Sequence, residues 1–136
     1  MKLAVKNIYG VKVCTELWSP KKRRQYFCFL ALEMFEEACH CLVASNMEKQ
    51  ADELADKCLE KDFSDSRKSK FWCIKGDIHN SEEYYEKAWE LSNERNARAM
   101  RSLGALLIHR KRYDAAADAF QKGKKNHIVF KTFLDK

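Results

Sequence analysis

One stretch of the sequence, residues 71–123, decides the fold. It contains FWCIKGDI (71–78), YYEKAWEL (84–91), ARAMRSLG (97–104) and YDAAADAF (113–120). The same sub-pattern occurs in it twice: a large residue lies four positions before a glycine, and an aromatic residue and an alanine close the helical run that follows. A pattern that recurs in this way predicts structural repeats that stack on one another.

The composition of the chain favours an all-α fold. The 136 residues are 46% hydrophobic and 12% aromatic, which suits one domain with a packed core. Four glycines and one proline leave few helix breakers, and helix-forming residues dominate the periodic runs. We therefore expect an all-α protein with an additional N-terminal helical segment before the repeats.

The N-terminal region carries no recognisable membrane span or cleavable signal, because Lys2, Lys6 and Lys12 interrupt its apolar runs. Without such a signal, the six cysteines predict reduced thiols and a location in the cytoplasm or the nucleus. The run Cys39-His40-Cys41 is the only cluster that suggests zinc, but it has no CxxC pair and residues two apart face different sides of a helix. We expect ordinary buried cysteines, no metal and no cofactor.

Residues 1–19 form a segment whose order the sequence leaves open. Its apolar residues between 8 and 13 fit a strand or a frayed helix, and Gly10 interrupts either. Ser19 and Pro20 then predict a helix start, with serine as the N-cap and proline at the first helical position. Apolar residues spaced by three and four continue the helical pattern over 26–44, either unbroken or broken near Leu32.

The basic run Lys21-Lys22-Arg23-Arg24 has two interpretations. It resembles a short nuclear-import signal, and four cations in the first turn of a helix oppose the helix dipole. The alternative is a solvated helix start without further function. Over the whole chain the charge is segregated, with net charges of +6 over residues 1–31, −7 over 32–66 and +7 over 67–136. Such blocks suit a surface that meets charged partners, and the alternative is that they are solvated helix faces.

Polar residues and capping signals divide the rest of the chain into further helices. We expect a polar loop over 62–68 and helices over 47–61, 70–78, 82–91, 97–110 and 113–125.

The last two of these helices resemble the tetratricopeptide repeat, a helix-turn-helix unit of 34 residues. With Ala97 as position 1, the matching residues at positions 4, 7, 8, 11, 17, 20, 24 and 27 are Met100, Leu103, Gly104, Leu107, Tyr113, Ala116, Phe120 and Gly123. In such a hairpin the small residues lie where the two helices approach. The aromatic residue at position 24 fills the space toward the next repeat.

The preceding unit matches with one departure. Trp72, Gly76, Tyr85 and Ala88 take positions 4, 8, 24 and 27, yet Gly76 and Tyr85 are nine residues apart where the repeat has sixteen. We therefore expect a first helix that is about two turns shorter. A weaker third unit begins at Leu32.

These matches predict a helical repeat domain over 20–125, with units at 32–65, 69–95 and 97–125. Residues 126–136 are expected to form the truncated start of a further repeat or a cap. The compressed middle unit is similar to the central region of the tetratricopeptide repeat protein 27 family. That family's chains are much longer, so we expect this chain to be a fragment of a longer repeat protein.

The resemblance implies an intracellular, non-catalytic α-solenoid that binds a protein partner in a concave groove lined by the first helices. The expected groove residues are Glu33, Glu36, His40, Val43 and Ala44 in the first unit, Lys70, Cys73 and Asp77 in the middle unit, and Arg98, Arg101, Ala105, Ile108 and His109 in the last. They grade from acidic to basic. A partner segment with the opposite grading is the expected ligand.

A subclass of these repeats grips the C-terminal carboxylate of heat-shock chaperones with lysine, asparagine and arginine at fixed positions. Here those positions hold Glu36, His40, Ile74, Arg98 and Ser102, of which only Arg98 fits. We therefore do not expect chaperone-tail binding.

Three other functions are alternatives to the scaffold. Binding of RNA by a basic helical repeat is the alternative, but Tyr85, Trp89, Tyr113 and Phe120 take repeat-core positions or their neighbours and would not be free to stack on bases. Catalysis is not expected, because the four histidines lack any catalytic spacing. Self-association is a further option if a truncated end exposes Phe120, Ile128, Val129, Phe130 and Phe133.

Overall fold

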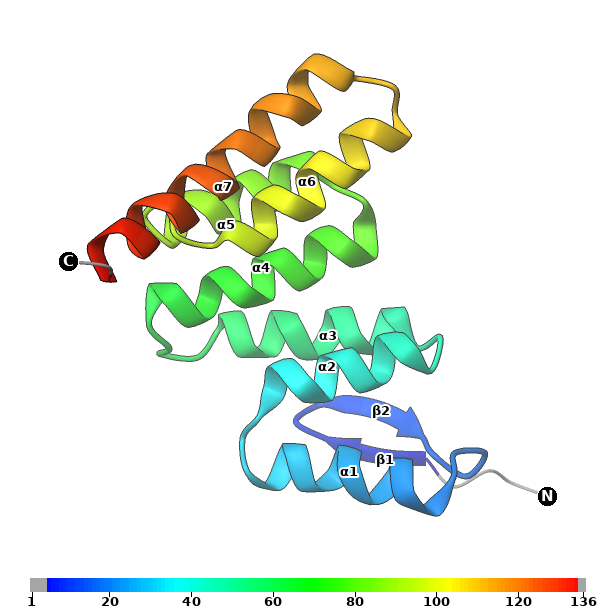
Figure 1. Ribbon diagram of the computed structural model, residues 1–136. Coiled ribbons are helices and arrows are strands. Elements are labelled where there is room, and N and C mark those ends of the chain that lie inside the picture. Colours follow the sequence, from blue (N-terminus) through cyan, green and yellow to red (C-terminus); the bar gives the residue numbers. More distant parts are fainter. Residues whose placement is uncertain (1–4, 135–136) are drawn as a thin grey trace. The chain divides into compact units, whose positions relative to one another are not determined.

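The computed structural model describes the backbone of residues 5–134 and the side chains of residues 9–124. Within this part of the chain, a β-hairpin is followed by seven α-helices, and neighbouring helices pack as sequential antiparallel pairs (Figure 1). The chain divides into two compact units, Met1–Phe63 and Ser64–Lys136. The prediction of an all-α repeat fold is confirmed, with the hairpin as an addition.

The hairpin occupies the N-terminal segment that the sequence left undecided. Strands β1 (Val5–Ile8) and β2 (Val11–Cys14) pair antiparallel and are joined by the two-residue turn Tyr9-Gly10. Both turn residues have positive φ, 57° and 77°, which is the twist that a tight hairpin needs. Gly10, which would interrupt a longer strand or a helix, supplies this conformation without strain.

The first unit is completed by α1 (Pro20–Ala31), α2 (Phe35–Ala44) and α3 (Glu48–Leu59). The apolar pattern over residues 26–44 therefore forms two helices, because Glu33 adopts a φ of 57° and reverses the chain between α1 and α2. The two helices then pack on each other, and α2 packs on α3.

The basic run after Pro20 is partly held by the structure. The Ser19 hydroxyl accepts a hydrogen bond from the backbone N–H of Lys22 at 3.2 Å and so caps α1. Arg23 donates to the backbone oxygen of Trp18 at 3.2 Å, and the Lys22 ammonium lies 5.4 Å from the centre of the Trp18 ring. The run therefore begins a capped helix, with two of its four cations folded back onto the preceding turn.

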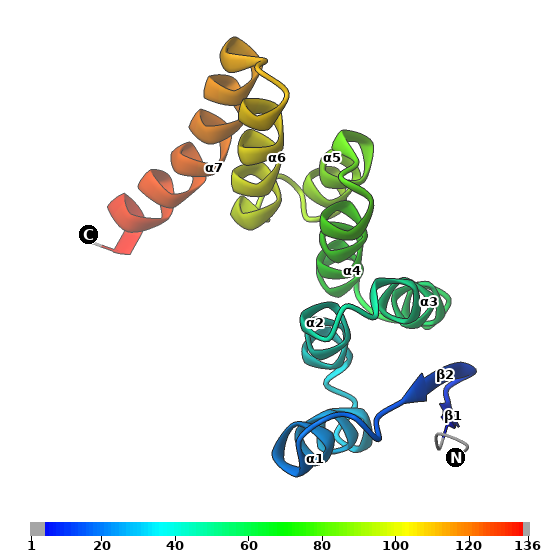
Figure 2. The same cartoon turned by 90° about the vertical axis from the view of Figure 1, so that its right-hand side faces the viewer.

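The second unit consists of α4 (Asp65–His79), α5 (Glu82–Leu91), α6 (Ala97–His109) and α7 (Tyr113–Leu134). In Figure 2, α4 lies beside α5 and α6 beside α7, each pair joined by a tight turn. α7 runs to Leu134, so residues 126–134 continue this helix and do not begin a separate one.

Side-chain caps set where these helices begin. The side chains of Ser64, Ser81 and Asn96 each accept a hydrogen bond from the backbone N–H three residues further on. Because Ser64 is such a cap, α4 begins at Asp65, and the loop predicted over 62–68 is shorter than expected.

The prediction that α4 is about two turns shorter than α6 is wrong: α4 has 15 residues and α6 has 13. The shortening lies at the tip of the α4–α5 hairpin. Gly76 is three residues from the end of α4 and Tyr85 is the fourth residue of α5, whereas Gly104 is five residues from the end of α6 and Phe120 is the eighth residue of α7. Both helices lose residues at the turn, and the early start at Asp65 restores the length of α4.

The core of the second unit joins all four helices. The buried residues that form this cluster are Cys73, Tyr85, Ala88, Trp89, Ala99, Met100, Leu103, Leu107, Ala116 and Ala119. It fixes the second unit as one body, on whose surface the site below is built.

Candidate functional site

Two glycine–aromatic contacts bring the paired helices of the second unit together. A Cβ atom added to Gly76 would lie 2.6 Å from Cε1 of Tyr85, and one added to Gly104 would lie 2.7 Å from Cζ of Phe120. The glycine and the aromatic residue that make this contact are nine positions apart in the α4–α5 pair and sixteen apart in the α6–α7 pair. The middle hairpin keeps the close approach of its helices despite its shortened tip.

Asp77 connects three helices beside the first of these contacts. One of its carboxylate oxygens accepts a hydrogen bond from the Tyr85 hydroxyl at 2.6 Å. The other accepts one from the Arg98 guanidinium at 3.1 Å. Burial, and then the hydrogen bond to Asp77, raise the pKa of the Tyr85 hydroxyl, so it stays protonated and donating at neutral pH. Asp77 therefore holds Arg98 of α6 at a fixed place relative to α4 and α5.

A cleft of about 570 Å³ lies next to this network, between α4 and α6. It is lined by Asp77, Asn80, Tyr85, Ser102, Ala105, Leu106, His109 and Arg110. The lining combines the apolar side chains of Ala105 and Leu106 with polar groups, and its charged residues Asp77 and Arg110 are both held in ion pairs.

Cys73 lies one turn before Asp77 on the same face of α4 but is buried. Burial raises the pKa of its thiol to about 11, the Asp77 carboxylate acts in the same direction, and Arg98 and Arg101 oppose it. At neutral pH the group is a protonated thiol. Its chemistry is that of a core side chain, without nucleophilic or metal-binding character.

A buried polar cluster joins α4, the end of α5 and the start of α6. The Ser69 hydroxyl donates to the backbone oxygen of Ala88 at 2.5 Å and accepts a hydrogen bond from the Asn96 side-chain amide at 2.9 Å. Ser69 is fully buried. Because Asn96 also caps α6, this cluster sets the position of α6, and with it one wall of the cleft.

Comparison with known proteins identifies the class of this fold. The chain is 38% identical over 93 residues to the tetratricopeptide repeat protein 27 homolog of Dictyostelium discoideum, a match covering 68% of this chain and 10% of that protein. The chain is a distant homologue of tetratricopeptide repeat proteins. It is also 38% identical over 85 residues to the tetratricopeptide repeat-containing protein trd-1 of Caenorhabditis elegans, covering 62% of the chain and 11% of that protein.

No protein-family model matches the sequence. The matched part spans about a tenth of the length of the two curated relatives. The predicted resemblance to the tetratricopeptide repeat protein 27 family is therefore confirmed as a distant homology over part of the chain.

The structure places the predicted groove residues of the last two repeats on neighbouring helices. Asp77, Ala105 and His109 line the α4–α6 cleft, and Arg98 touches it through Asp77. Lys70, Arg101 and Ile108 are exposed on the same helices, and Cys73 is buried.

The predicted groove residues of the first repeat lie in the other unit. His40 is exposed and lines a cleft of about 610 Å³ between α1 and α2, together with residues such as Lys21, Lys22 and Phe29. Glu36 is half-buried and does not line this cleft. The cleft that His40 lines is thus shared with α1, a helix that precedes the predicted repeat.

The predicted repeat-signature residues take varied environments. Ala88, Leu103 and Ala116 are buried, and Gly76 and Gly104 face aromatic rings as described. Trp72 is half-buried, with the Lys87 ammonium 4.0 Å from its ring centre.

The aromatic residues differ between the two hairpins. Tyr85 and Trp89 are buried, but Tyr113 is 62% exposed and Phe120 is 37% exposed. The sequence predicted core positions, or positions next to the core, for all four residues. Tyr113 and Phe120 are exposed because no later helix packs against α7 in the described residues. The side chains of Ile128, Val129, Phe130 and Phe133, named above for self-association, lie outside the described residues, as does that of His127.

Within the described residues, no group of three or more histidine, cysteine or acidic side chains could hold a metal ion. None of the described helices is both long enough and apolar enough to cross a bilayer. The six cysteines are free thiols, of which Cys39, Cys58 and Cys73 are buried.

Sequence analysis missed several residues that shape the cleft. Asn80 and Arg110 meet there because the α4–α5 tip is short: the Arg110 guanidinium donates to the Asn80 backbone oxygen at 2.9 Å. Leu106 was missed because it lies between the groove positions of the repeat pattern. The sequence signal available for Asn80 and Arg110 was the spacing from Gly76 to Tyr85, which is nine residues where the repeat has sixteen. Spacing alone cannot show that the missing residues are at the turn.

Proposed function

We propose that this chain is a non-catalytic scaffold whose second unit binds an acidic, extended segment of a protein partner along α4 and α6. The observation that carries the proposal is the excess of free positive charge on this face. Asp77 is neutralised by Arg98 and hydrogen-bonded to Tyr85, whereas Lys70 and Arg101 are exposed and form no ion pair with any described side chain.

The spacing of these residues supports an extended ligand. Lys70 and Asp77 are seven residues apart on α4, which places them on one face two turns apart. Arg98, Arg101 and Ala105 lie in the same way along one face of α6. A segment lying along both helices meets cations first and the apolar side chains of the cleft afterwards. Acidic residues in the ligand would pair with Lys70 and Arg101, and an apolar residue would enter beside Leu106.

The cleft is held in shape before any ligand binds. The Asp77 network ties α4, α5 and α6 together, and the Ser69–Asn96 cluster fixes the start of α6. A rigid binding face loses little conformational entropy on binding, so a short segment can bind it with useful affinity. Homology to tetratricopeptide repeat proteins supports a scaffold in place of an enzyme.

The test uses the double variant Lys70→Glu/Arg101→Glu. Arg98 is left intact because its substitution would release Asp77 and disturb the fold. The control Arg95→Glu/Lys124→Glu makes the same change in net charge at two exposed positions away from the cleft. Binding of a fluorescein-labelled extended peptide with alternating glutamate and leucine is measured by anisotropy, and partners are captured from cell extract treated with nuclease.

We expect the groove variant to weaken peptide binding about tenfold and to lose partners that survive nuclease, while the control retains both. Retention of the partner by the groove variant would reject the assignment of this face. Capture that disappears with nuclease in every variant would favour RNA binding, the alternative raised by the basic charge of residues 67–136. The location in the cytoplasm or nucleus stays a prediction.

A further inference from the structure

A second cleft of the second unit lies between α5 and α7. Its volume is about 360 Å³, and it shares no lining residue with the α4–α6 cleft. Between α5 and α7 no pair of described Cα atoms lies within 8 Å. The two helices therefore form opposite walls, and side chains of α6 reach the space between them.

The floor of this cleft is apolar. Met100, Leu103 and Leu107 come from successive turns of α6, and Trp89 contributes from α5. Ala115 and Ala119 form the α7 side at a spacing of one turn. These small side chains leave room above the floor, so large apolar side chains of a ligand could approach it.

The α5 wall is acidic along its whole length. Glu82, Glu86, Glu90 and Glu94 all line the cleft, and they follow one another at intervals of four residues. Glu82, Glu86 and Glu90 therefore lie on one face of α5 over a distance of about 12 Å, and Glu94 follows in the loop after the helix.

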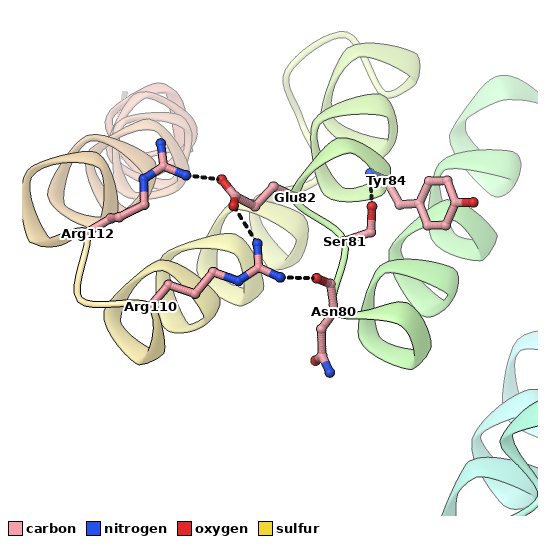
Figure 3. Close-up of polar contacts among 6 residues, drawn as sticks. All are labelled: Asn80, Ser81, Glu82, Tyr84, Arg110 and Arg112. Atoms are coloured by element: carbon pink, nitrogen blue, oxygen red, sulfur yellow. Dashed lines mark hydrogen bonds and ion pairs between the residues drawn. The ribbon is translucent and has the colours of Figure 1, made fainter.

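Only the first of these four glutamates is neutralised by described residues. Figure 3 shows the Glu82 carboxylate between Arg110 and Arg112, whose guanidinium groups donate to its two oxygens at 2.5 and 2.7 Å. Glu86, Glu90 and Glu94 are exposed and make no ion pair with any described side chain.

The α7 wall does not compensate this charge. It contributes the cations Arg112 and Lys122, but Arg112 is already paired with Glu82, and Asp118 lies between the two on the same wall. The cleft therefore keeps a net negative rim over an apolar floor, on a protein whose net charge is +6.

We propose that the α5–α7 cleft binds a basic amphipathic helix of a partner protein. The apolar face of such a helix would cover Met100, Leu103 and Leu107, and its flanking lysines or arginines would pair with Glu86, Glu90 and Glu94. The helical part of the acidic wall, from Glu82 to Glu90, is about two turns long, which matches a helix whose cations recur every turn. Docking of an amphipathic helix into an apolar groove is a general mode of peptide recognition, and the charges set the orientation.

This site is separate from the one proposed for the acidic segment. The two clefts share no lining residue, so the chain would join an acidic segment and a basic helix at two places on one small body. Arg110 of the first cleft pairs with Glu82 of the second, but the substitutions at Lys70 and Arg101 and those at Glu86 and Glu90 leave this pair intact, so the two proposals can fail independently.

The probe is an 18-residue, fluorescein-labelled helical peptide with leucines on one face and lysines flanking them. Its control is a peptide of the same composition with the leucines spread around the helix. Anisotropy is measured with the full chain, with Glu86→Lys/Glu90→Lys, and with the matched control Glu83→Lys/Asp114→Lys, whose exposed residues lie on the same two helices outside the cleft. Circular dichroism checks that each variant is folded.

We expect saturable binding of the amphipathic peptide, weakened about tenfold in Glu86→Lys/Glu90→Lys and less than twofold in the control variant. Added salt should weaken binding to the unaltered chain, because the rim charges are exposed. The milder Glu86→Gln/Glu90→Gln, which keeps the side-chain size, should give an intermediate loss, and it replaces the lysine variant if that one does not fold. Lys70→Glu/Arg101→Glu should leave the affinity for this peptide within twofold.

Three results would overturn the proposal. The first is the absence of saturable binding, and the second is equal binding of the control peptide. The third is dimerisation of the unaltered chain, measured by light scattering, that Glu86→Lys/Glu90→Lys abolishes, because a second copy of the chain would then be the occupant of the cleft.

Discussion

Alanine substitution at Gly76 and at Gly104 tests whether the two glycine–aromatic contacts are equally rigid. At Gly76 the new Cβ would lie 2.6, 2.7 and 3.1 Å from Cε1, Cδ1 and Cγ of Tyr85, along the whole edge of the ring. At Gly104 it would meet only the far end of the Phe120 ring, at 2.7 to 2.8 Å. Tyr85 is 4% exposed and tied to Asp77, while Phe120 is 37% exposed.

The two substitutions should therefore differ in their effect on the free energy of unfolding. Overpacking a core costs about 1–3 kcal/mol, and moving Tyr85 also weakens its hydrogen bond to a carboxylate, worth about 1.5–3 kcal/mol. Alanine recovers about 1 kcal/mol of helix propensity. We expect Gly76→Ala to destabilise the second unit by about 3 kcal/mol. For Gly104→Ala, the Phe120 ring can swing outward, and we expect a change within about 1 kcal/mol of zero.

Urea denaturation followed by tryptophan fluorescence measures these changes. Trp18 lies in the first unit, so a Trp18→Phe background leaves Trp72 and Trp89 as reporters of the second unit. Within that background, the unaltered glycines serve as the reference. A cost at Gly104 equal to or above the cost at Gly76 would refute the argument that the hydrogen bond and burial hold the tyrosine ring in place.

Three further predictions concern buried or bridging groups. Ser69→Ala removes two hydrogen bonds of a buried hydroxyl, one to the Ala88 backbone oxygen and one from the Asn96 amide, and should lower the free energy of unfolding by about 2 kcal/mol. The exposed Ser66→Ala should change it by less than about 0.5 kcal/mol. Glu82→Gln removes two partly exposed ion pairs and should cost about 1 kcal/mol in low salt and less in high salt, with Glu83→Gln near zero. Burial raises the pKa of Cys73 from 9.0 to about 11, so the folded chain binds this proton more tightly than the unfolded chain does. The free energy of unfolding should therefore fall as the pH rises from about 9 to 11. In urea titrations at these pH values, Cys73→Ala should remove up to about 3 kcal/mol of that loss.

Local sequence signals were sufficient for much of the fold. The three- and four-residue spacing of apolar residues predicted the helices, and Ser19, Ser81 and Asn96 lie where N-caps were expected, or at the residue just before a predicted helix. These signals act between residues close together along the chain, which is why they can be read without a structure.

Predictions were left open or were wrong where local signals compete. The run over 26–44 keeps its helical periodicity across residues 32–34, but the positive φ of Glu33 turns the chain there. In the same way, the nine-residue separation of Gly76 and Tyr85 correctly indicated a compressed hairpin. Where the shortening lies depended on how far α4 extends toward the N-terminus. Spacing reports how many residues are missing and cannot report from which end they are taken.

For the candidate sites, the regular period of one helix face led the sequence analysis to groove positions on α4 and α6, of which Asp77, Ala105 and His109 line the cleft. It could not show that Cys73 is buried there or that Asp77 is already neutralised by Arg98. The acidic rim of the α5–α7 cleft was visible as four glutamates, but its apolar floor was not, because that floor comes from α6.

The sequence by itself determined that this chain is a helical repeat protein, that small and aromatic residues mark its hairpins, and which helix faces carry charge. Only the tertiary structure decided which of those charges remain free and where an apolar surface stays open beside them. The physical reason is that periodicity and capping are properties of one helix, whereas ion pairs such as Arg98–Asp77 join residues 21 positions apart. Those pairs exist only once the helices have packed.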